Sequence, residues 1–485
     1  MTETTLKQKT AKGLFWGGIS SGAQQLLGVA FGIYLARMLT ADDYGLIGML
    51  AIFTGIVNTI INSGFSIALI NKKDASEKDY NAVFWFSFFM GLSLYIILFF
   101  CAPSIARFYE RPELTLISRV LFIGFFLGCI GLVPYTIMSK QLKVKEQSII
   151  NIIAILISGI TGIFLAFKGF AYWALVAQNA LYSSLLSIQA YIISPWKPTF
   201  YINFHPLKKL FSFSVKLFIT NIFVQISGNF LSVLVGKLYN ATQLGYYTQG
   251  QKWMGMGNMF IGGMISSVAQ PILVQVNEEK ERQVNVFRKM IRFGAFISFP
   301  LMLGLAFVSR EFILITIREK WLPSIPFLQL FCIWGAFAYL SALFTNLIYT
   351  HGKSNIYMYI TIAIGLLQLL TVVLLHRLGI FSMVIGYLFV YFISLFVWQY
   401  YVRRLIGLRL RDTLRDISPY LFITLVCFLI TWFLTKNIIN LYLLLISKII
   451  ISGILYLLIL KMSNSTIFKE SMNFLFMKKN RSVMK

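Results

Sequence analysis

Long apolar runs recur along the whole chain and constrain its fold more than any other feature. Each is about 20 residues long, the length that an α-helix needs to cross the hydrocarbon of a bilayer. The composition agrees, because 58% of the residues are hydrophobic, only 12% are charged and the mean hydropathy is +0.75. We place the predicted helices at 14–36, 45–70, 81–106, 114–138, 148–167, 171–193, 213–235, 244–275, 287–309, 324–349, 356–375, 379–401, 417–435 and 440–460. The sequence therefore predicts an all-α integral membrane protein with about 14 transmembrane helices.

The positive charges follow the alternation of the predicted loops. Of the 43 Lys and Arg residues, 29 lie in the two termini and in every second loop, and 10 lie in the other loops. Loops rich in Lys and Arg stay on the cytoplasmic side of a membrane. Both termini are therefore predicted to be cytoplasmic, in a multi-pass protein of the cytoplasmic (inner) membrane. The net charge of +26 is interpreted as a topology signal and an attraction for anionic headgroups, not as a nucleic-acid interface.

An internal duplication divides the chain. When the sequence is shifted by 200 positions, residues 19–66 align with 219–266 without a gap, and nine positions are identical. Several of them are Gln, Asn and Gly, which two unrelated membrane helices would rarely share at one offset. The identical pairs are Ile19/Ile219, Gln25/Gln225, Gly28/Gly228, Ala41/Ala241, Gly45/Gly245, Gly55/Gly255, Asn58/Asn258, Ile61/Ile261 and Ser66/Ser266.

The duplication predicts two six-helix lobes. Because six helices separate equivalent positions, both copies enter the membrane from the same side, so the repeat is parallel. The predicted N-terminal lobe covers 1–200 and the C-terminal lobe 201–405. Residues 406–485 add two extra transmembrane helices and a basic cytoplasmic tail.

Residues for catalysis or metal binding are missing from the predicted spans. All 17 acidic residues fall in predicted loops or tails, whereas proton and sodium relays normally use carboxylates inside the membrane. The three His and four Cys residues show no ligand spacing. The sequence therefore predicts no enzyme activity, no cofactor and no metal.

Several segments resemble the polysaccharide transporter family. They are YLARMLTADDYGLIGM at 34–49, INSGFSIALINKKD at 61–74, the stretches 84–114 and 266–307, and REKWLPSIPFLQLF at 318–331. More narrowly, they resemble its Wzx-type branch, the lipopolysaccharide and teichuronic-acid exporters of the multidrug/oligosaccharidyl-lipid/polysaccharide flippase superfamily. The resemblance implies two lobes around a central cavity and the export of a lipid-linked oligosaccharide, such as an O-antigen precursor, for the cell envelope. It also implies partners: membrane lipids and the polymerase and glycosyltransferases of the same pathway.

Basic residues are the first candidates for substrate binding, because an isoprenoid pyrophosphate is anionic. Lys252 lies about two turns inside its predicted helix, where it either faces a wet cavity or extends to the headgroups. Lys216 is only one turn from the cytoplasmic end, where it either snorkels to the headgroups or faces the cavity as a further binding candidate. Arg37 and Lys237 occupy the same register of the repeat.

Repeated polar residues are the second set of candidates. Gln25, Gln225, Asn58 and Asn258 can hydrogen-bond a sugar or a phosphate. The face of helix 14–36 that carries Gln25 also carries Gly28 and Gly32, and it is interpreted either as a close-packing face or as a cavity wall.

Two other functions stay open at this stage. A cation-coupled multidrug antiporter of the same superfamily would require an acidic coupling site. A membrane O-antigen polymerase or ligase would be expected to have one large external loop, and the longest predicted here has about 14 residues.

Overall fold

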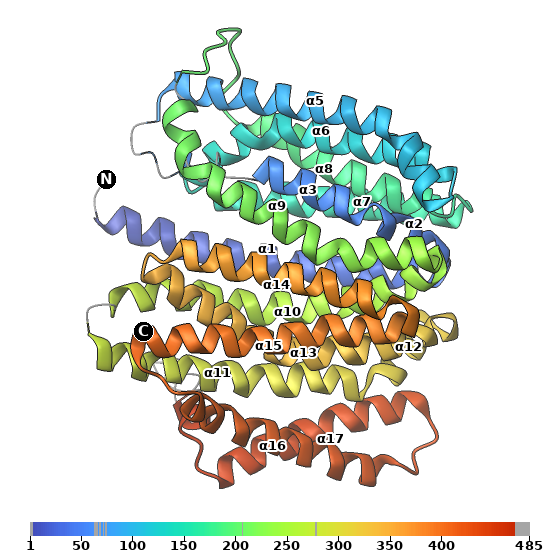
Figure 1. The fold of residues 1–485 in the computed structure, drawn as a ribbon, viewed down its shortest axis with the longest axis vertical. Coiled ribbons are helices and arrows are strands. Elements are labelled where there is room, and N and C mark those ends of the chain that lie inside the picture. The colour runs from blue at the N-terminus through green and yellow to red at the C-terminus, as the bar shows by residue number, and fades with distance from the viewer. Residues whose placement is uncertain are drawn as a thin grey trace. The chain divides into compact units, whose positions relative to one another are not determined.

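Helices form the part of the chain that the computed structural model describes (Figure 1). The described residues are 3–62, 66, 69–70, 72, 75–205, 207–276 and 279–470. Within these ranges there is no strand. The predicted all-α class is therefore confirmed.

Contacts divide the chain into two compact units, Met1–Thr248 and Gln249–Lys485. The helices of the first unit are α1 (Glu3–Met38), α2 (Ala41–Met49), α3 (Ala51–Asn62), α5 (Glu77–Tyr109), α6 (Glu113–Lys140), α7 (Val144–Phe167), α8 (Trp173–Ile193) and α9 (Leu207–Leu238). Helix α10 (Ala241–Gln275) begins in the first unit and continues in the second. The predicted lobe boundaries at 200 and 405 stay predictions.

The second unit continues through two short helices that the sequence did not predict. These are α12 (Ser309–Ile317) and the 3-10 helix η1 (Glu319–Ser324). The other helices are α11 (Lys280–Phe307), α13 (Ile325–Thr350), α14 (Ser354–Leu375), η2 (His376–Leu378), α15 (Ile380–Ile406), α16 (Leu410–Thr435) and α17 (Leu441–Met462).

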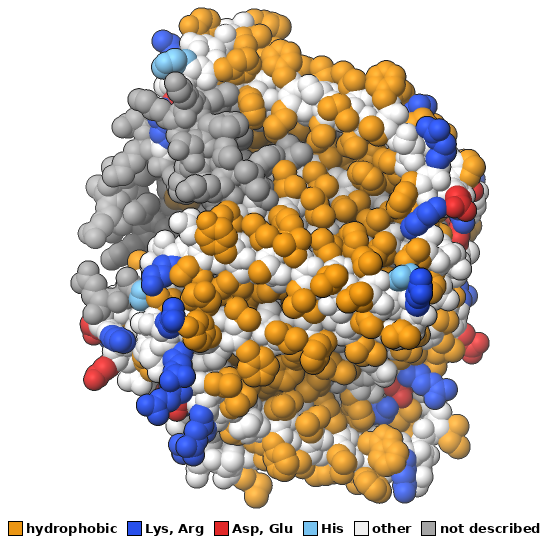
Figure 2. Space-filling view, viewed as in Figure 1, with side chains coloured by type: hydrophobic (Ala, Val, Ile, Leu, Met, Phe, Trp, Pro, Cys, Tyr) orange, Lys and Arg blue, Asp and Glu red, His pale blue; other side chains and the backbone are white. Residues whose placement is uncertain are grey.

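Eleven helices of the described part are long and apolar enough to cross a membrane. The other three predicted spans are helical too: 45–70 begins as α2 and α3, 171–193 is α8 and 244–275 is α10. On the face in Figure 2, hydrophobic side chains cover the middle of the helices, and charged side chains gather toward the helix ends. This arrangement is compatible with 14 spans.

The two units repeat one order of neighbouring helices. In the first unit, α5 packs on α6, α6 on α8 and α8 on α7. In the second unit, α11 packs on α13, α13 on α15 and α15 on α14. The duplication is thus visible in the packing as well as in the sequence. Helix α9, which opens the second sequence copy, packs on α3 in the first unit.

A crossing of two helix starts brings repeat-related residues together. A Cβ atom added at Gly45 in α2 would overlap the carbonyl group of Ala241, and one added at Gly245 in α10 would overlap that of Ala41. The contact is reciprocal and joins two of the identical pairs. Only glycine lets two backbones approach so closely.

The start of α2 is fixed by a capping box. Thr40 Oγ1 accepts from the Asp43 backbone N–H at 3.3 Å, and the Thr40 N–H donates to Asp43 Oδ2 at 2.8 Å. Such reciprocal bonds satisfy the free N–H groups of a first helical turn. The helix predicted from residue 45 thus begins four residues earlier, at Ala41.

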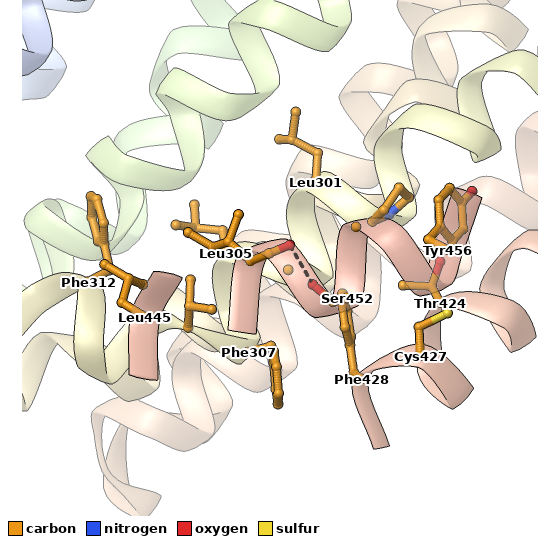
Figure 3. A pocket seen from close by; sticks show the side chains of 15 residues that line it. Leu301, Leu305, Phe307, Phe312, Thr424, Cys427, Phe428, Leu445, Ser452 and Tyr456 are labelled. Atoms are coloured by element: carbon orange, nitrogen blue, oxygen red, sulfur yellow. Dashed lines mark hydrogen bonds between the residues drawn. The ribbon is translucent and has the colours of Figure 1, made fainter. Parts of the chain in front are cut away.

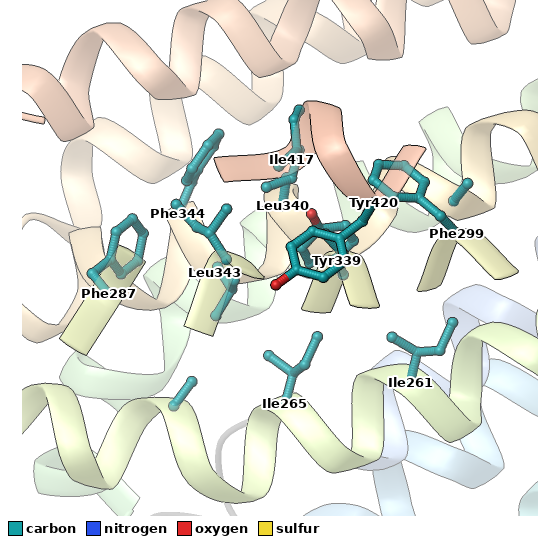
Figure 4. Close-up of a cluster of buried hydrophobic side chains, with 14 of the residues drawn as sticks. Ile261, Ile265, Phe287, Phe299, Tyr339, Leu340, Leu343, Phe344, Ile417 and Tyr420 are labelled. Carbon is teal, nitrogen blue, oxygen red and sulfur yellow. The ribbon is translucent and has the colours of Figure 1, made fainter. Parts of the chain in front are cut away.

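A large cluster of buried side chains forms the core of the second unit (Figure 4). Phe287 and Phe299 of α11 and Tyr339 and Phe344 of α13 lie in it. Figure 4 shows Ile261 and Ile265 of α10 on one side of these rings, and Ile417 of α16 on the other. The core thus ties α16, which has no counterpart in the first repeat, to the repeated helices.

The prediction that all acidic residues lie in loops or tails is wrong. Asp43, Asp79, Glu311 and Asp416 lie on helices and are buried. The prediction failed because the helices extend into polar turns that hydropathy alone assigns to loops. Each carboxylate has a partner: Asp43 caps α2, Lys72 pairs with Asp79, Lys448 with Glu311, and Arg288 with Asp416.

Lys448 and Glu311 form the most enclosed of these pairs. Lys448 Nζ of α17 lies 2.8 Å from Glu311 Oε1 of α12, and the two side chains are 11% and 7% exposed. Lys448 Nζ also lies 4.7 Å from the centre of the Phe307 ring. The pair therefore ties α17 to α12.

The Gly45→Ala variant should unfold at a much lower temperature than the wild type. The new methyl group would overlap helix backbone, which cannot rotate away, so we expect a loss of about 3 kcal/mol or more, the upper end of overpacking costs. Gly28→Ala is the control, because nothing lies within 4 Å of a Cβ there. The measurement is thermal unfolding of the purified proteins. An unchanged midpoint for Gly45→Ala would contradict the crossing.

Lys448→Met should destabilise the protein by about 3–5 kcal/mol, because it leaves the Glu311 carboxylate buried without its cation. Glu311→Gln in the same chain should restore part of the loss. Removing the exposed Arg282–Glu279 pair should change stability by less than about 1 kcal/mol. Unfolding midpoints of the four proteins check this, and equal losses from the buried and exposed pairs would refute it.

Candidate functional site

A polar cavity lies within the first unit. It has a volume of about 450 Å³ and is lined by α3, α6, α7, α8 and the segment after α3. Its lining residues are Asn58, Ser66, Ile70, Phe125, Gly128, Gly131, Leu132, Tyr135, Thr136, Ser139, Asn151, Tyr182, Ser183, Leu186 and Ser187. Hydroxyl and amide groups from five segments thus meet inside a bundle of otherwise apolar helices.

Hydrogen bonds hold part of this lining in place. Asn151 Nδ2 donates to Tyr135 Oη at 3.1 Å, and Thr136 Oγ1 donates to Ser66 Oγ at 3.0 Å. The Asn151 amide also donates to the Gln147 carbonyl at 2.8 Å. These bonds connect α6 to α7 and to Ser66.

The chemistry of the lining suits a neutral polar ligand. It combines hydroxyl groups, amides and tyrosine rings, and it includes no charged side chain. Hydroxyls and amides can both donate and accept hydrogen bonds, as a sugar requires, and aromatic rings offer an apolar face. The volume is within the usual range for small-molecule sites.

Sequence reasoning found only one residue of this cavity. Asn58 was a predicted site residue, whereas Tyr135, Ser139, Asn151 and Ser183 were not recognised. A signal was present, because Tyr135 and Ser139 are four residues apart on one helix, as are Gln147 and Asn151 on the next, and such pairs share a helix face.

Gln225 lies beside α3, close to Asn58. A Cβ at Gly55, one turn before Asn58, would be 2.5 Å from Gln225 Oε1. The same oxygen accepts from Asn229 Nδ2 at 3.2 Å. The structure therefore brings two of the predicted residues, Asn58 and Gln225, to adjoining turns of packed helices.

Gln25 lies on a face of α1 that is open in the structure. Gln25 is half-buried, and a Cβ at Gly28 would meet nothing within 4 Å. The repeat-related Gly228 on α9 has open space beside it as well. These two glycines therefore do not serve close helix packing here, and a cavity wall remains the prediction for both faces.

Lys252 and Asn258 lie on α10 within the second unit. Lys252 is half-buried, one turn after Gln249, which is fully buried. No hydrogen bond to either amide atom of Gln249 is found in the described part of the chain. Asn258 Nδ2 contacts Met254 Sδ at 3.1 Å. Lys252 thus lies one turn after a buried amide whose hydrogen bonds a ligand or water would supply.

Lys237 is held in an ion pair at the end of α9. Its Nζ lies 2.7 Å from Glu110 Oε1 and 5.5 Å from the centre of the Phe108 ring. The hydrogen bond from Lys237 lowers the pKa of the Glu110 carboxyl below its ordinary value. Arg37 is exposed in the last turn of α1. The side chain of Lys216 is outside the described residues.

An apolar groove runs between α11, α16 and α17 in the second unit (Figure 3). Its volume is about 410 Å³. Figure 3 shows Leu305 and Phe307 of α11 between Leu445 of α17 and Phe428 of α16. Such a lining suits a hydrocarbon chain.

Comparison with protein families identifies relatives of this chain. A family model described as polysaccharide biosynthesis protein matches residues 34–326. The teichuronic acid biosynthesis protein TuaB of Bacillus subtilis is 26% identical over 73% of this chain and 74% of its own length. The lipopolysaccharide biosynthesis protein WzxC of Escherichia coli is 22% identical over 68% of each chain.

Two solved structures share the fold. The lipid II flippase MurJ, in an inward closed conformation, has a TM-score of 0.75 over 95% of this chain and 99% of its own, at 15% identity. An inward-facing multidrug resistance transporter of the MATE family has a TM-score of 0.65 over 79% of this chain and 94% of its own, also at 15% identity.

A cysteine at Asn58 should react with a small water-soluble thiol reagent in a variant without the four native cysteines. The cavity is polar and admits water, and the thiolate that attacks a thiol reagent forms in water and not in lipid. Ile160→Cys on α7 is the control, because Ile160 is 60% exposed but apolar and faces the bilayer in this prediction. The measurement is the labelling rate of each cysteine in membranes. If neither cysteine reacts, a hydrated cavity is excluded.

Proposed function

The chain belongs to the polysaccharide biosynthesis protein family, and from this premise we propose that it moves a lipid-linked oligosaccharide across the cytoplasmic membrane. In this proposal the substrate is an isoprenoid pyrophosphate that carries a polysaccharide precursor for the cell envelope. The protein transports it by alternating access and makes or breaks no covalent bond, so it is not an enzyme.

The names of the similar proteins support this substrate class. Two relatives are named for the biosynthesis of teichuronic acid and lipopolysaccharide, and the Rhizobium meliloti relative ExoT is named a succinoglycan biosynthesis transport protein. MurJ, which shares the fold, is named a flippase for lipid II. The common element is a glycan or its lipid-linked precursor that must cross a membrane.

The pairing of buried charges is the observation that carries the proposal. In the described part of the chain, each of the buried carboxylates Asp43, Asp79, Glu311 and Asp416 caps a helix or pairs with a cation. Lys252 is a cation within α10, one turn after the buried amide of Gln249. A membrane site with a cation and no available carboxylate suits an anionic substrate.

In this proposal, each unit contains residues that suit one part of the substrate. Lys252 of the second unit attracts the pyrophosphate, with Gln249 as a hydrogen-bonding neighbour. The polar cavity of the first unit, around Asn58 and Tyr135, is proposed in its own right for glycan contacts. The hydrocarbon tail of the substrate stays in the bilayer. Arg37, Lys237 and Lys216 remain further predicted binding residues.

The pairing of the buried carboxylates also argues against the alternative function, a multidrug antiporter. The likeness to a MATE transporter concerns the fold, and coupling to a cation flow normally uses a carboxylate that gains and loses the cation. The buried carboxylates of the described helices are already committed to structural partners. We therefore retain the flippase.

The proposal includes an orientation and partners. Both termini face the cytoplasm, as the distribution of Lys and Arg indicates. The substrate is then loaded from the cytoplasmic leaflet, after glycosyltransferases have built it, and is delivered to a polymerase on the other side.

Lys252→Met should reduce delivery of the glycan to the cell surface by about ten-fold or more. A charge-assisted hydrogen bond is worth about 1.5–3 kcal/mol, and about 1.4 kcal/mol corresponds to ten-fold. Lys252→Arg should keep much of the activity because it keeps the charge. The measurement is surface glycan in cells that lack the native protein, at matched membrane levels of each variant.

Lys168→Met is the matched control, because Lys168 is exposed at the end of α7. It removes the same charge and should deliver the glycan normally. Full delivery by Lys252→Met at normal membrane levels would remove Lys252 from the site and leave the amide residues as the remaining candidates.

A further inference from the structure

A basic cavity lies at one end of the seam between α11, α16 and the segment after α17. Its volume is about 420 Å³. The residues that matter for its chemistry are Arg288, Arg292, Arg415, Asp416, Ser465 and Thr466. Its lining shares no residue with the polar cavity of the first unit and does not include Lys252.

Three arginines line this cavity, together with a single carboxylate. Arg288 Nε and Nη2 lie 2.8 and 3.0 Å from the two oxygens of Asp416, a bidentate pair. Arg292 Nε lies 3.6 Å from the same carboxylate. Arg415 is exposed, and no carboxylate pairs with it in the described part of the chain. Asp412 stands one turn before Asp416 and is not part of the lining.

The pairing fixes some arginine donors and leaves others available. Asp416 is only 5% exposed and holds Arg288 through both of its oxygens. A guanidinium has five N–H donors, so Arg292 and Arg415 retain most of theirs. Ser465 and Thr466 add hydroxyl groups, and Ser465 Oγ lies 3.2 Å from Tyr420 Oη. Guanidinium and hydroxyl donors around one space match the oxygens of a phosphate.

Helices α11, α16 and α17 line both this basic cavity and the apolar groove described above. Arg292 lies eight residues before Pro300 on α11, Tyr420 lies four before Thr424 on α16, and Leu460 lies four after Tyr456 on α17. At 1.5 Å per residue these steps are about 6–12 Å. A basic cavity thus precedes an apolar groove on one seam, an arrangement that fits a molecule with a phosphate head and a hydrocarbon tail.

The outer faces of α16 and α17 also suit contact with lipid. Leu425 and Leu429 on α16 and Ile450 and Ile454 on α17 are each more than half exposed. The basic cavity belongs to the ends of α11 and α16 and to the C-terminal segment, which the charge pattern assigns to the cytoplasmic side. Basic pockets between helices on this side bind the headgroups of anionic lipids.

We propose that this seam binds an anionic phospholipid that is not transported. Arg292 and Arg415 hold the phosphodiester, Ser465 and Thr466 add hydrogen bonds, and an acyl chain follows the apolar groove. Helices α16 and α17 have no counterpart in the repeat, so the lipid binds outside the part of the chain that the proposed function uses. The bound lipid fastens α16 and α17 to α11.

Native mass spectrometry of the full chain, with phosphatidylglycerol as probe, tests the proposal. The variant is Arg292→Gln with Arg415→Gln, which keeps the buried Arg288–Asp416 pair. Because both charge-assisted contacts are lost, its affinity for phosphatidylglycerol should fall about ten-fold or more. Zwitterionic phosphatidylcholine should bind the wild type and the variant equally weakly.

Arg409→Gln with Arg411→Gln is the matched control. It removes the same charge from the start of α16, where both residues are exposed and outside the cavity lining. This control should bind phosphatidylglycerol as the wild type does. A similar loss in both double variants would refute the site, because the attraction would then come from general surface charge. Unfolding midpoints confirm that each protein is folded.

Two competitors distinguish the sources of the phosphate. Inorganic phosphate at millimolar concentration should leave phosphatidylglycerol bound, and displacement would indicate a site for free phosphate and overturn the proposal. An isoprenyl phosphate should bind less tightly than phosphatidylglycerol. Tighter binding of the isoprenyl phosphate, lost in the Arg292/Arg415 variant, would make this a carrier site and overturn the phospholipid assignment without affecting the flippase proposal.

Discussion

The backbone contact between α2 and α10 is the constraint on which the arrangement of the repeat depends. Gly45 meets Ala241, and Gly245 meets Ala41, so each copy contributes the same two residues to one reciprocal contact. Side chains at the glycine positions would push the backbones apart. The contact fixes the register of two segments that are 200 residues apart in sequence, and the helices that carry Arg37 and Lys237 end just before it.

The two units repeat the same order of neighbouring helices, but their interiors differ in polarity. The first unit encloses the polar cavity around Asn58, whereas the second encloses the aromatic core around Phe287, Phe299 and Phe344. A duplicated fold can therefore keep its packing while one copy acquires polar positions. We interpret the first unit as the part that contacts the glycan.

In the described helices, the buried carboxylates are committed to structural partners. The Lys448–Glu311 pair joins α17 to α12, and the Arg288–Asp416 pair joins α16 to α11. A buried ion needs a partner because its desolvation is costly. The two pairs attach the two extra C-terminal helices to α12 and α11, and the proposed phospholipid would reinforce one of these attachments.

The sequence by itself determined the all-helical membrane class, the duplication and the family resemblance, because each depends on local hydropathy or on residue identity at one offset. It also pointed to Asn58. Only the tertiary structure decided that Tyr135, Asn151 and Ser183 share a cavity with Asn58, since they come from separate helices whose rotation no single helix pattern fixes. It also decided that Glu311 and Asp416 are buried, because their cations lie more than 100 residues away and pairing depends on how the helices pack.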